Sequence, residues 1–178
     1  QYEPQFPYES GPREYQRQAF ENWKANGQQG LFAMATGTGK TITSLNCLLE
    51  IYKRTGYYKA IILVPTITLV NQWESECRKF NFNAILKVSG SNSEWREELG
   101  SIKASEQLDT TGKSVSYVII CTYASFAKPA VFDKLNSLSR NRLLFIADEA
   151  HNMGSRQLMK KLGDITYYRR IGLSATPE

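Results

Sequence analysis

The stretch Met34-Ala-Thr-Gly-Thr-Gly-Lys-Thr41 decides the fold that this chain can adopt. It follows a small and apolar run at residues 31–35 and precedes a segment of helical period that begins at Lys40. Glycines let the backbone curl with its N–H groups inward, and the positive end of the next helix faces the same concavity. A plain glycine-rich turn is the alternative, and Met34 holds the position of the first glycine in the common G-x-x-x-x-G-K-[ST] pattern. The strand-loop-helix context nevertheless predicts a phosphate-binding loop.

A second polar stretch, Asp148-Glu-Ala-His151, follows the apolar run at residues 143–147. Open parallel sheets collect ligands at the carboxyl ends of their strands, and Mg²⁺ takes oxygen ligands. The alternative is a helix N-terminus that carries acidic residues, which the helix dipole would stabilise. We predict that the two stretches together form a site for ATP and Mg²⁺.

Each side chain of the two stretches is given a separate role. Lys40 would reach the β- and γ-phosphates, and Thr41 would place its hydroxyl on Mg²⁺. Asp148 would hold the same Mg²⁺, directly or through water, and Glu149 would polarise the attacking water as a general base. Lys40, Asp148 and Glu149 are therefore the candidate catalytic residues. The loop that would bind the phosphates consists of Thr36, Gly37, Thr38 and Gly39.

The composition limits the class of protein. The chain has 178 residues, 42% of them apolar, which suits one domain with a sizeable core. It has no apolar run long enough to span a membrane and no signal-peptide pattern at residues 1–12. Cys47, Cys77 and Cys121 lie far apart without metal-ligand spacing, so we expect reduced core thiols and a cytoplasmic or nucleoid-associated protein. His151 is the single histidine, which excludes a multi-histidine metal site, and the net charge of +5 is compatible with a polyanion partner.

Continuously apolar runs alternate with longer segments of helical period along the chain. This alternation predicts an α/β fold in which helices cover both faces of a mostly parallel sheet of about six or seven strands. Residues 101–116 are polar, and 109–113 reads as an exposed loop or hairpin tip. The expected strands are 31–35, 60–64, 85–88, 117–121, 143–147 and 170–174, and the expected helices are 12–25, 40–54, 67–80, 93–99, 123–138 and 154–161.

Six short motifs occur in a fixed order, and together they resemble the first RecA-like domain of superfamily 2 helicases and translocases, the DEAH-box group. The forms at 146–152 and 172–177 look similar to the restriction-enzyme and xeroderma pigmentosum group B branch, which acts on duplex DNA. The resemblance covers almost the whole chain and implies a P-loop, RecA-like three-layer sandwich. The motifs are Arg13-Glu-Tyr-Gln16, Met34 to Thr41, Pro65-Thr66 followed by Leu69 and Gln72-Trp73, Thr122-Tyr123, Asp148 to His151, and Ser174-Ala-Thr176.

The resemblance implies further roles for individual residues. Gln16 carries an amide that can bond the adenine edge in both directions, and Arg13 would support the base. Phe6 or Tyr8 would cover the base, or would simply pack in the core. Thr66 and Thr122 would contact the nucleic-acid backbone, although Thr after a strand is also an ordinary helix cap. The residues that would couple the γ-phosphate to nucleic acid are His151, Ser174 and Thr176.

The resemblance also implies a longer protein. Residues 1–178 would form a single ATP-binding domain, with 1–28 as adenine-recognition element and first helix. A second RecA-like domain, outside this chain, would supply an arginine finger, so the isolated domain should hydrolyse ATP poorly. DNA is the favoured partner over RNA, and nuclease or restriction subunits are further candidate partners.

Several alternatives stay open at this point. The chain could belong to an RNA helicase, to a motor that moves a substrate other than nucleic acid, or to a non-catalytic interaction module. Exposed base-stacking is one interpretation of Trp73, Trp95, Tyr57-Tyr58 and Tyr167-Tyr168, but packing between helices and sheet is the more common use of such residues.

Overall fold

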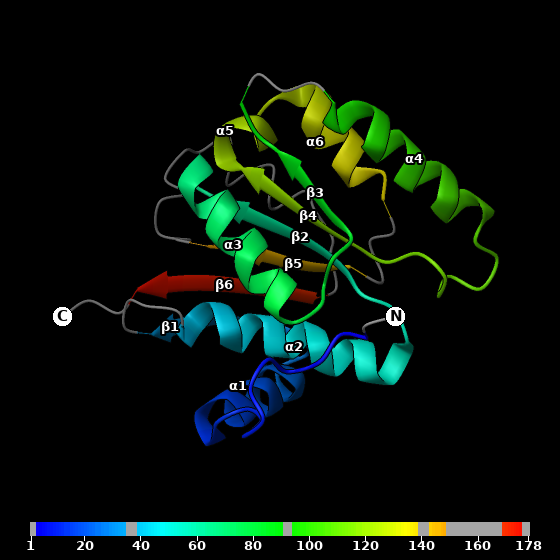
Figure 1. Ribbon diagram of the computed structural model, residues 1–178. Helices are drawn as coiled ribbons and strands as arrows, with labels where there is room; N and C mark the ends of the chain where they lie inside the picture. Colours follow the sequence, from blue (N-terminus) through cyan, green and yellow to red (C-terminus); the bar gives the residue numbers. More distant parts are fainter. Residues whose placement is uncertain (1–2, 35–38, 91–93, 139–142, 149–168, 176–178) are drawn as a thin grey trace.

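The computed structural model describes residues 3–34, 39–90, 94–138, 143–148 and 169–175. Its centre is a six-stranded sheet in the order β1-β6-β5-β2-β4-β3, and every neighbouring pair is parallel. Figure 1 shows helices on both sides of this sheet, as the sequence predicted. The strands are β1 (Gln29–Met34), β2 (Lys59–Val64), β3 (Ile85–Val88), β4 (Tyr117–Thr122), β5 (Leu144–Ala147) and β6 (Arg169–Ala175).

The central strands are apolar throughout because both of their faces are covered. Successive side chains of a strand point to opposite faces, so β2 divides its residues between two cores. Ala60, Ile62 and Val64 belong to one core, whereas Ile61 and Leu63 belong to the other. All five of these side chains are fully buried.

Three helices form the layer on the first face: α1 (Glu14–Ala25), α2 (Gly39–Thr55) and α3 (Ile67–Lys79). The indole N–H of Trp23 in α1 donates to the carbonyl oxygen of Arg170 at 3.0 Å, which attaches α1 to the start of β6. Helix α3 begins at the cap residue Thr66, whose hydroxyl accepts from the Leu69 N–H at 3.2 Å. It buries Trp73 against the sheet.

The layer on the second face differs from the sequence prediction in two places. It consists of α4 (Trp95–Leu108), α5 (Tyr123–Phe126) and α6 (Pro129–Asn136). The single helix expected over 123–138 is broken before Pro129, because the residue that precedes a proline is disfavoured in the helical region. The helix expected to end at residue 99 continues to Leu108, so the predicted helix was too short, whereas the loop predicted at 109–113 is confirmed. The helix expected at 154–161 lies outside the described residues.

Several side chains with two interpretations prove to be core residues. Trp95, Tyr57 and Tyr58 are buried, as packing residues should be. The three cysteines are free and buried, as predicted, and burial raises the pKa of the Cys121 thiol to about 12. Across the described part of the chain, the helices are too short or too polar to span a membrane.

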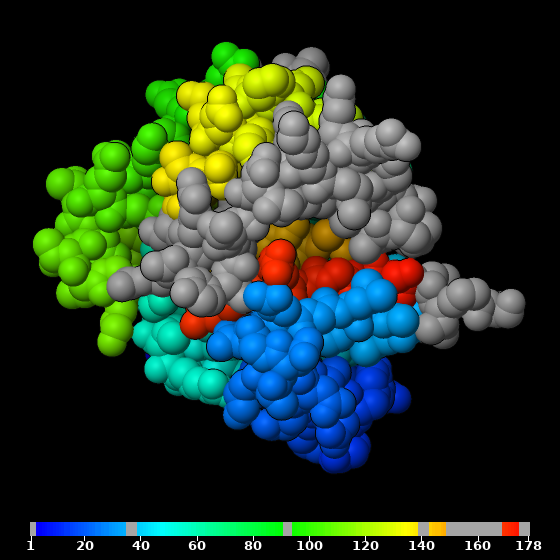
Figure 2. Space-filling model, turned by 180° about the vertical axis from the view of Figure 1, so that it is seen from behind, coloured from blue at the N-terminus to red at the C-terminus, as the bar shows by residue number. Residues whose placement is uncertain are grey.

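The parallel arrangement gathers the strand ends that matter for the site. All the carboxyl ends lie at one edge of the sheet, and β6 separates β1 from β5. Figure 2 shows this order from behind, with β6 in red between β1 in light blue and β5 in orange. The loop after β1 and the residue after β5 are therefore brought to the same edge.

A buried ion pair explains why the polar end of α4 is helical. Glu106 points into the protein and accepts from Lys59 Nζ at 2.6 Å and from the Tyr117 hydroxyl at 3.1 Å. The Lys59 and Glu106 side chains are 1% and 7% exposed. The pair joins α4 to the amino-terminal ends of β2 and β4, a long-range contact that local sequence does not reveal.

Removal of one partner should therefore destabilise the domain. We expect Glu106→Gln to lower the free energy of unfolding by about 3 kcal/mol, because it leaves the Lys59 charge buried without a counter-charge. Urea unfolding followed by circular dichroism measures the change. Glu50→Gln is the matched control, because its pair with Lys53 is solvent-exposed and should contribute less than about 1 kcal/mol. Equal losses in the two variants would contradict this account.

Candidate nucleotide and metal site

The fold brings together two of the predicted catalytic residues. Lys40 is the second residue of α2, and Asp148 directly follows β5. Lys40 Nζ lies 3.3 Å from Asp148 Oδ1, and the two side chains are only 8% and 3% exposed. Two opposite charges are thus held close together at the carboxyl edge of the sheet, out of bulk water.

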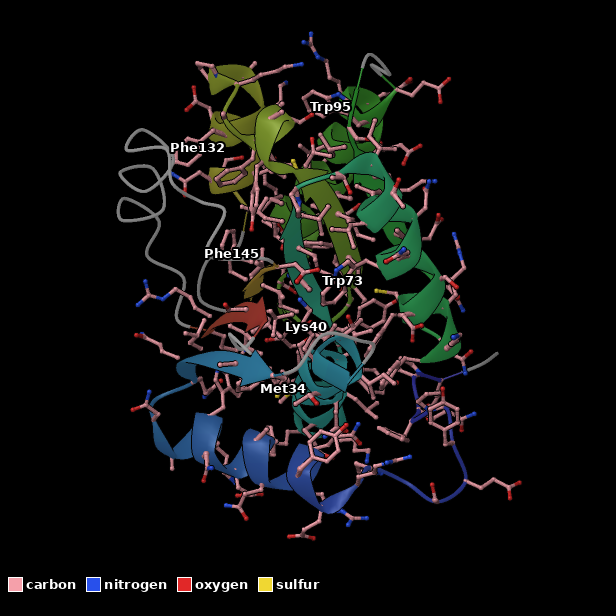
Figure 3. The ribbon with its side chains drawn as sticks, turned by 90° about the vertical axis from the view of Figure 1, so that its left-hand side faces the viewer. Met34, Lys40, Trp73, Trp95, Phe132 and Phe145 are labelled. Atoms are coloured by element: carbon pink, nitrogen blue, oxygen red, sulfur yellow. The ribbon has the colours of Figure 1, made fainter. Side chains whose placement is uncertain are left out.

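Asp148 is held at three further atoms. Its backbone N–H donates to the Leu63 carbonyl at 2.8 Å, its carbonyl accepts from the Tyr123 hydroxyl, and its Oδ2 accepts from the Trp73 indole N–H at 2.8 Å. Figure 3 shows the Trp73 and Lys40 side chains converging from α3 and α2. The sequence did not assign this role to Trp73; its place directly after Gln72 in the third motif was the only signal.

The residues present fit a magnesium ion bound together with phosphates. Mg²⁺ usually takes one or two carboxylates, keeps several waters and uses substrate phosphates, so a dedicated acidic cage is not needed. Accordingly, the described residues contain no cluster of three His, Cys, Asp or Glu side chains. Thr41 is half-buried at the start of α2, whereas the Thr43 and Ser44 hydroxyls donate to helix carbonyls, to Gly39 at 2.6 Å and Thr41 at 2.9 Å. Thr41 and Asp148 are the residues that would hold the ion.

A cavity of about 480 Å³ opens next to the start of α2. Both residues predicted for adenine, Arg13 and Gln16, line it. Gln16 is buried, and its Oε1 accepts from the Arg13 N–H at 2.8 Å while its Nε2 donates to the Tyr15 hydroxyl at 3.4 Å. A carbonyl oxygen has two lone pairs, so this Oε1 can accept a second hydrogen bond from a ligand. The remaining lining residues are Phe6, Tyr8, Ser10, Gly11, Gly39 and Ile42.

The aromatic residues expected to cover the base belong to this cavity but also pack on each other. Phe6 meets Tyr8 and Phe80 edge to face, with ring centroids 6.0 and 5.5 Å apart. Tyr8 is 51% exposed, so its ring can move over a ligand, whereas Phe6 is partly buried against the core.

The two threonines predicted to contact nucleic acid differ in what their hydroxyls do. Thr66 is exposed; its oxygen accepts from Leu69 N–H, and a hydroxyl retains its own proton to donate. Thr122 is buried, accepts from Ser125 N–H at 3.2 Å and donates to Ser125 Oγ at 3.0 Å. The geometry suits a phosphate contact by the Thr66 side chain, and a contact by the Thr122 segment would have to use other atoms.

One of the remaining predicted residues, Ser174, belongs to the described part of the chain. It lies on β6, opposite Ala33 of β1 in the ladder, and is half-buried. The other members of the expected site are Thr36, Gly37, Thr38, Glu149, His151 and Thr176, which lie outside the described residues.

Comparisons with known proteins identify the family of this chain. Residues 9–178 match the family described as "Type III restriction enzyme, res subunit". The helicase candidate numbered 22 of Sulfolobus islandicus filamentous virus is 32% identical over 168 residues, which cover 93% of this chain and 28% of that protein. DNA 3'-5' translocase XPB2 of Sulfurisphaera tokodaii is 28% identical over 169 residues, covering 93% and 31%. The chain therefore spans less than a third of either curated relative.

Solved structures share the fold. The Sulfolobus solfataricus SWI2/SNF2 ATPase core, solved in complex with dsDNA, superposes with a TM-score of 0.68 at 19% identity, covering 99% of this chain and 35% of that one. The UvsW helicase of bacteriophage T4 gives a TM-score of 0.61 at 18% identity, covering 92% and 52%. Because the family match covers residues 9–178, this chain belongs to the type III restriction enzyme res-subunit family, and its fold is the RecA-like fold of these solved structures.

Proposed function

We propose that this chain is the ATP-binding half of a nucleic-acid-dependent ATPase that moves on DNA as a helicase or double-strand translocase. The observation that carries the proposal is the buried Lys40–Asp148 pair at 3.3 Å, placed between two strand ends beside a cavity that contains Gln16. A lysine at the start of a helix, beside a carboxylate at the end of a parallel strand, can bind a phosphate chain with its cation.

The residues suggest how the site would work. Asp148 Oδ1 lies 3.3 Å from Lys40 Nζ and holds the ammonium at the site. Lys40 would bind the phosphates that enter the loop, and Asp148 and Thr41 would hold Mg²⁺. The ion would supply positive charge that offsets the negative charge of the phosphates. Glu149, next in sequence after Asp148, would take a proton from the attacking water.

The proposed contact with nucleic acid rests on the segments after β2 and β4. These strands are neighbours, so Thr66 and Thr122 lie at the same edge of the sheet as Asp148. Contacts of this kind bind the phosphate backbone and do not read sequence. DNA is favoured over RNA because relatives are named as a DNA translocase and as an ATPase core bound to dsDNA. His151, Ser174 and Thr176 would couple this contact to the γ-phosphate, and restriction or nuclease subunits are further proposed partners.

Two other functions remain distinguishable by experiment. A motor for a substrate other than nucleic acid would keep the same nucleotide site but would not respond to polynucleotides. A non-catalytic interaction module would have no use for a general base at Glu149.

Two substitutions in the nucleotide site should separate ATP binding from ATP hydrolysis. We expect Lys40→Ala to weaken ATP binding by 10-fold or more, about 1.4 kcal/mol, because it removes the point charge on the phosphates. Glu149→Gln should leave binding intact and abolish hydrolysis in the full-length protein. Fluorescence titration with a labelled nucleotide and a phosphate-release assay measure the two effects. Lys53→Ala, at the exposed end of α2, is the control, and loss of binding in that variant would remove the basis of the assignment.

Gln16 should confer selectivity for adenine. We expect Gln16→Ala to reduce the preference for ATP over GTP by roughly 5- to 100-fold, since a two-way amide contact contributes about 1–3 kcal/mol to base discrimination. Competition between ATP and GTP for a fluorescent nucleotide measures the preference. Gln18→Ala controls for the helix, because Gln18 is exposed and bonds only to Asn22 among the interactions that the structure describes. An unchanged preference would show that another group reads the base.

If the ATP site needs a second domain, ATP hydrolysis should depend on that domain and on DNA. The isolated chain should bind ATP and turn it over slowly, because the arginine finger belongs to a second domain. The full-length protein should be stimulated by DNA, with an apparent affinity that falls steeply as salt rises. Phosphate release measured side by side with single-stranded DNA, duplex DNA and RNA decides this. The absence of stimulation by any polynucleotide would falsify the proposal in favour of a motor for another substrate.

A further inference from the structure

The Asp148 carboxylate has two oxygens with very different partners. Oδ1 faces the ammonium of Lys40 at 3.3 Å, whereas Oδ2 accepts from the indole N–H of Trp73 at 2.8 Å. An indole N–H is neutral, donates one hydrogen bond and accepts none. A phosphate is negatively charged and attracts the Lys40 ammonium far more strongly than the neutral Trp73 indole. The partner of Oδ1 is therefore the one that would turn to a phosphate, and the partner of Oδ2 would stay.

Trp73 is built into the core so that this donor cannot move. Its side chain is among the largest fully buried ones, with 1% of the residue exposed, and it lies in the core beneath α2 and α3. A phenylalanine would fill most of this space, so packing alone does not require an indole here. The N–H is the atom that distinguishes tryptophan at this position.

We propose that Trp73 is a positioning residue that fixes the rotation of the Asp148 carboxylate, so that Oδ1 is aimed at the cation when nucleotide enters. This inference rests on the proposed nucleotide site and deepens it. Outer hydrogen-bond partners of metal-binding carboxylates orient them, and loss of such a partner typically weakens metal affinity by 10- to 100-fold.

The chain offers a matched control. Trp23 also buries its ring in the same core, with 2% exposed, and also donates its indole N–H to a single oxygen, the Arg170 carbonyl at 3.0 Å. That bond lies at the amino-terminal end of β6, opposite the edge that carries Asp148. Trp23→Phe therefore removes an equivalent ring and hydrogen bond without touching the carboxylate.

The first test compares Trp73→Phe and Trp23→Phe by titrating a fluorescent ATP analogue at increasing Mg²⁺ and in EDTA. Trp73→Phe should raise the Mg²⁺ concentration needed for half-maximal binding by about 10-fold or more, with the EDTA affinity unchanged. Trp23→Phe should change neither. A general folding defect would weaken both conditions equally, and that result, like an unchanged Mg²⁺ requirement, would overturn the inference. If Trp73→Phe does not fold, replacement of Trp73 by 3-benzothienylalanine removes only the N–H and is judged by the same criteria.

The second test locates the cation relative to the three tryptophans and is done with the ATP analogue present, because the ion is expected to use phosphate oxygens. The three tryptophans give three indole N–H signals in a ¹H–¹⁵N spectrum, and Trp73→Phe identifies the one that belongs to Trp73. Mn²⁺, a paramagnetic substitute for Mg²⁺, should broaden the Trp73 signal before those of Trp23 and Trp95. Uniform broadening, or none, while the analogue is bound would refute the positioning role. If the wild-type chain binds no nucleotide at any Mg²⁺ concentration, the proposed function fails; if it binds nucleotide and Trp73→Phe leaves the Mg²⁺ requirement unchanged, only the positioning role fails.

Discussion

The buried pair of Lys40 and Asp148 is the interaction on which the rest of the site depends. Removing two charges from water is costly, and a buried ion pair often contributes less to stability than apolar residues of similar size. The surrounding sheet could be completed with apolar side chains, as it is along β2 and β4. The pair is therefore better explained by the proposed function, in which Lys40 would bind phosphates and Asp148 would bind their cation, than by its contribution to stability.

Helix α3 connects the parts of the molecule that the proposed function requires. Its cap, Thr66, lies at the edge of the sheet; its middle, Trp73, holds Asp148; and its end, Phe80, packs against Phe6 beside the cavity. The backbone N–H of Gln5 also donates to the Phe80 carbonyl at 3.0 Å. A helix is stiff over this length and protein cores are closely packed, so the three contacts are held in a fixed arrangement relative to one another.

The sequence predicted the sheet and the central pair because both depend on local signals. Continuous apolar runs mark covered parallel strands, and the ends of such strands must meet at one edge, which brings Lys40 to Asp148 without any knowledge of distances. It failed where a distant partner decides the structure. The helix that contains Glu106 ends in polar residues, and only the buried Lys59 shows why it continues. Trp73 was ambiguous for the same reason, since its role depends on Asp148, which lies far along the chain.

The contrast between Thr66 and Thr122 shows how capping and binding compete for one hydroxyl. A threonine that caps a helix uses its oxygen as an acceptor, which leaves its proton for an acceptor such as phosphate. Thr66 is in this situation, and it is exposed. Thr122 is buried, and its hydroxyl donates a hydrogen bond to Ser125. Its side chain therefore stabilises the short helix that places Tyr123 against Asp148. Two motifs that look equivalent in the sequence therefore differ in the structure: the Thr66 hydroxyl faces outward to solvent, and the Thr122 hydroxyl faces inward beside the helix whose Tyr123 contacts Asp148.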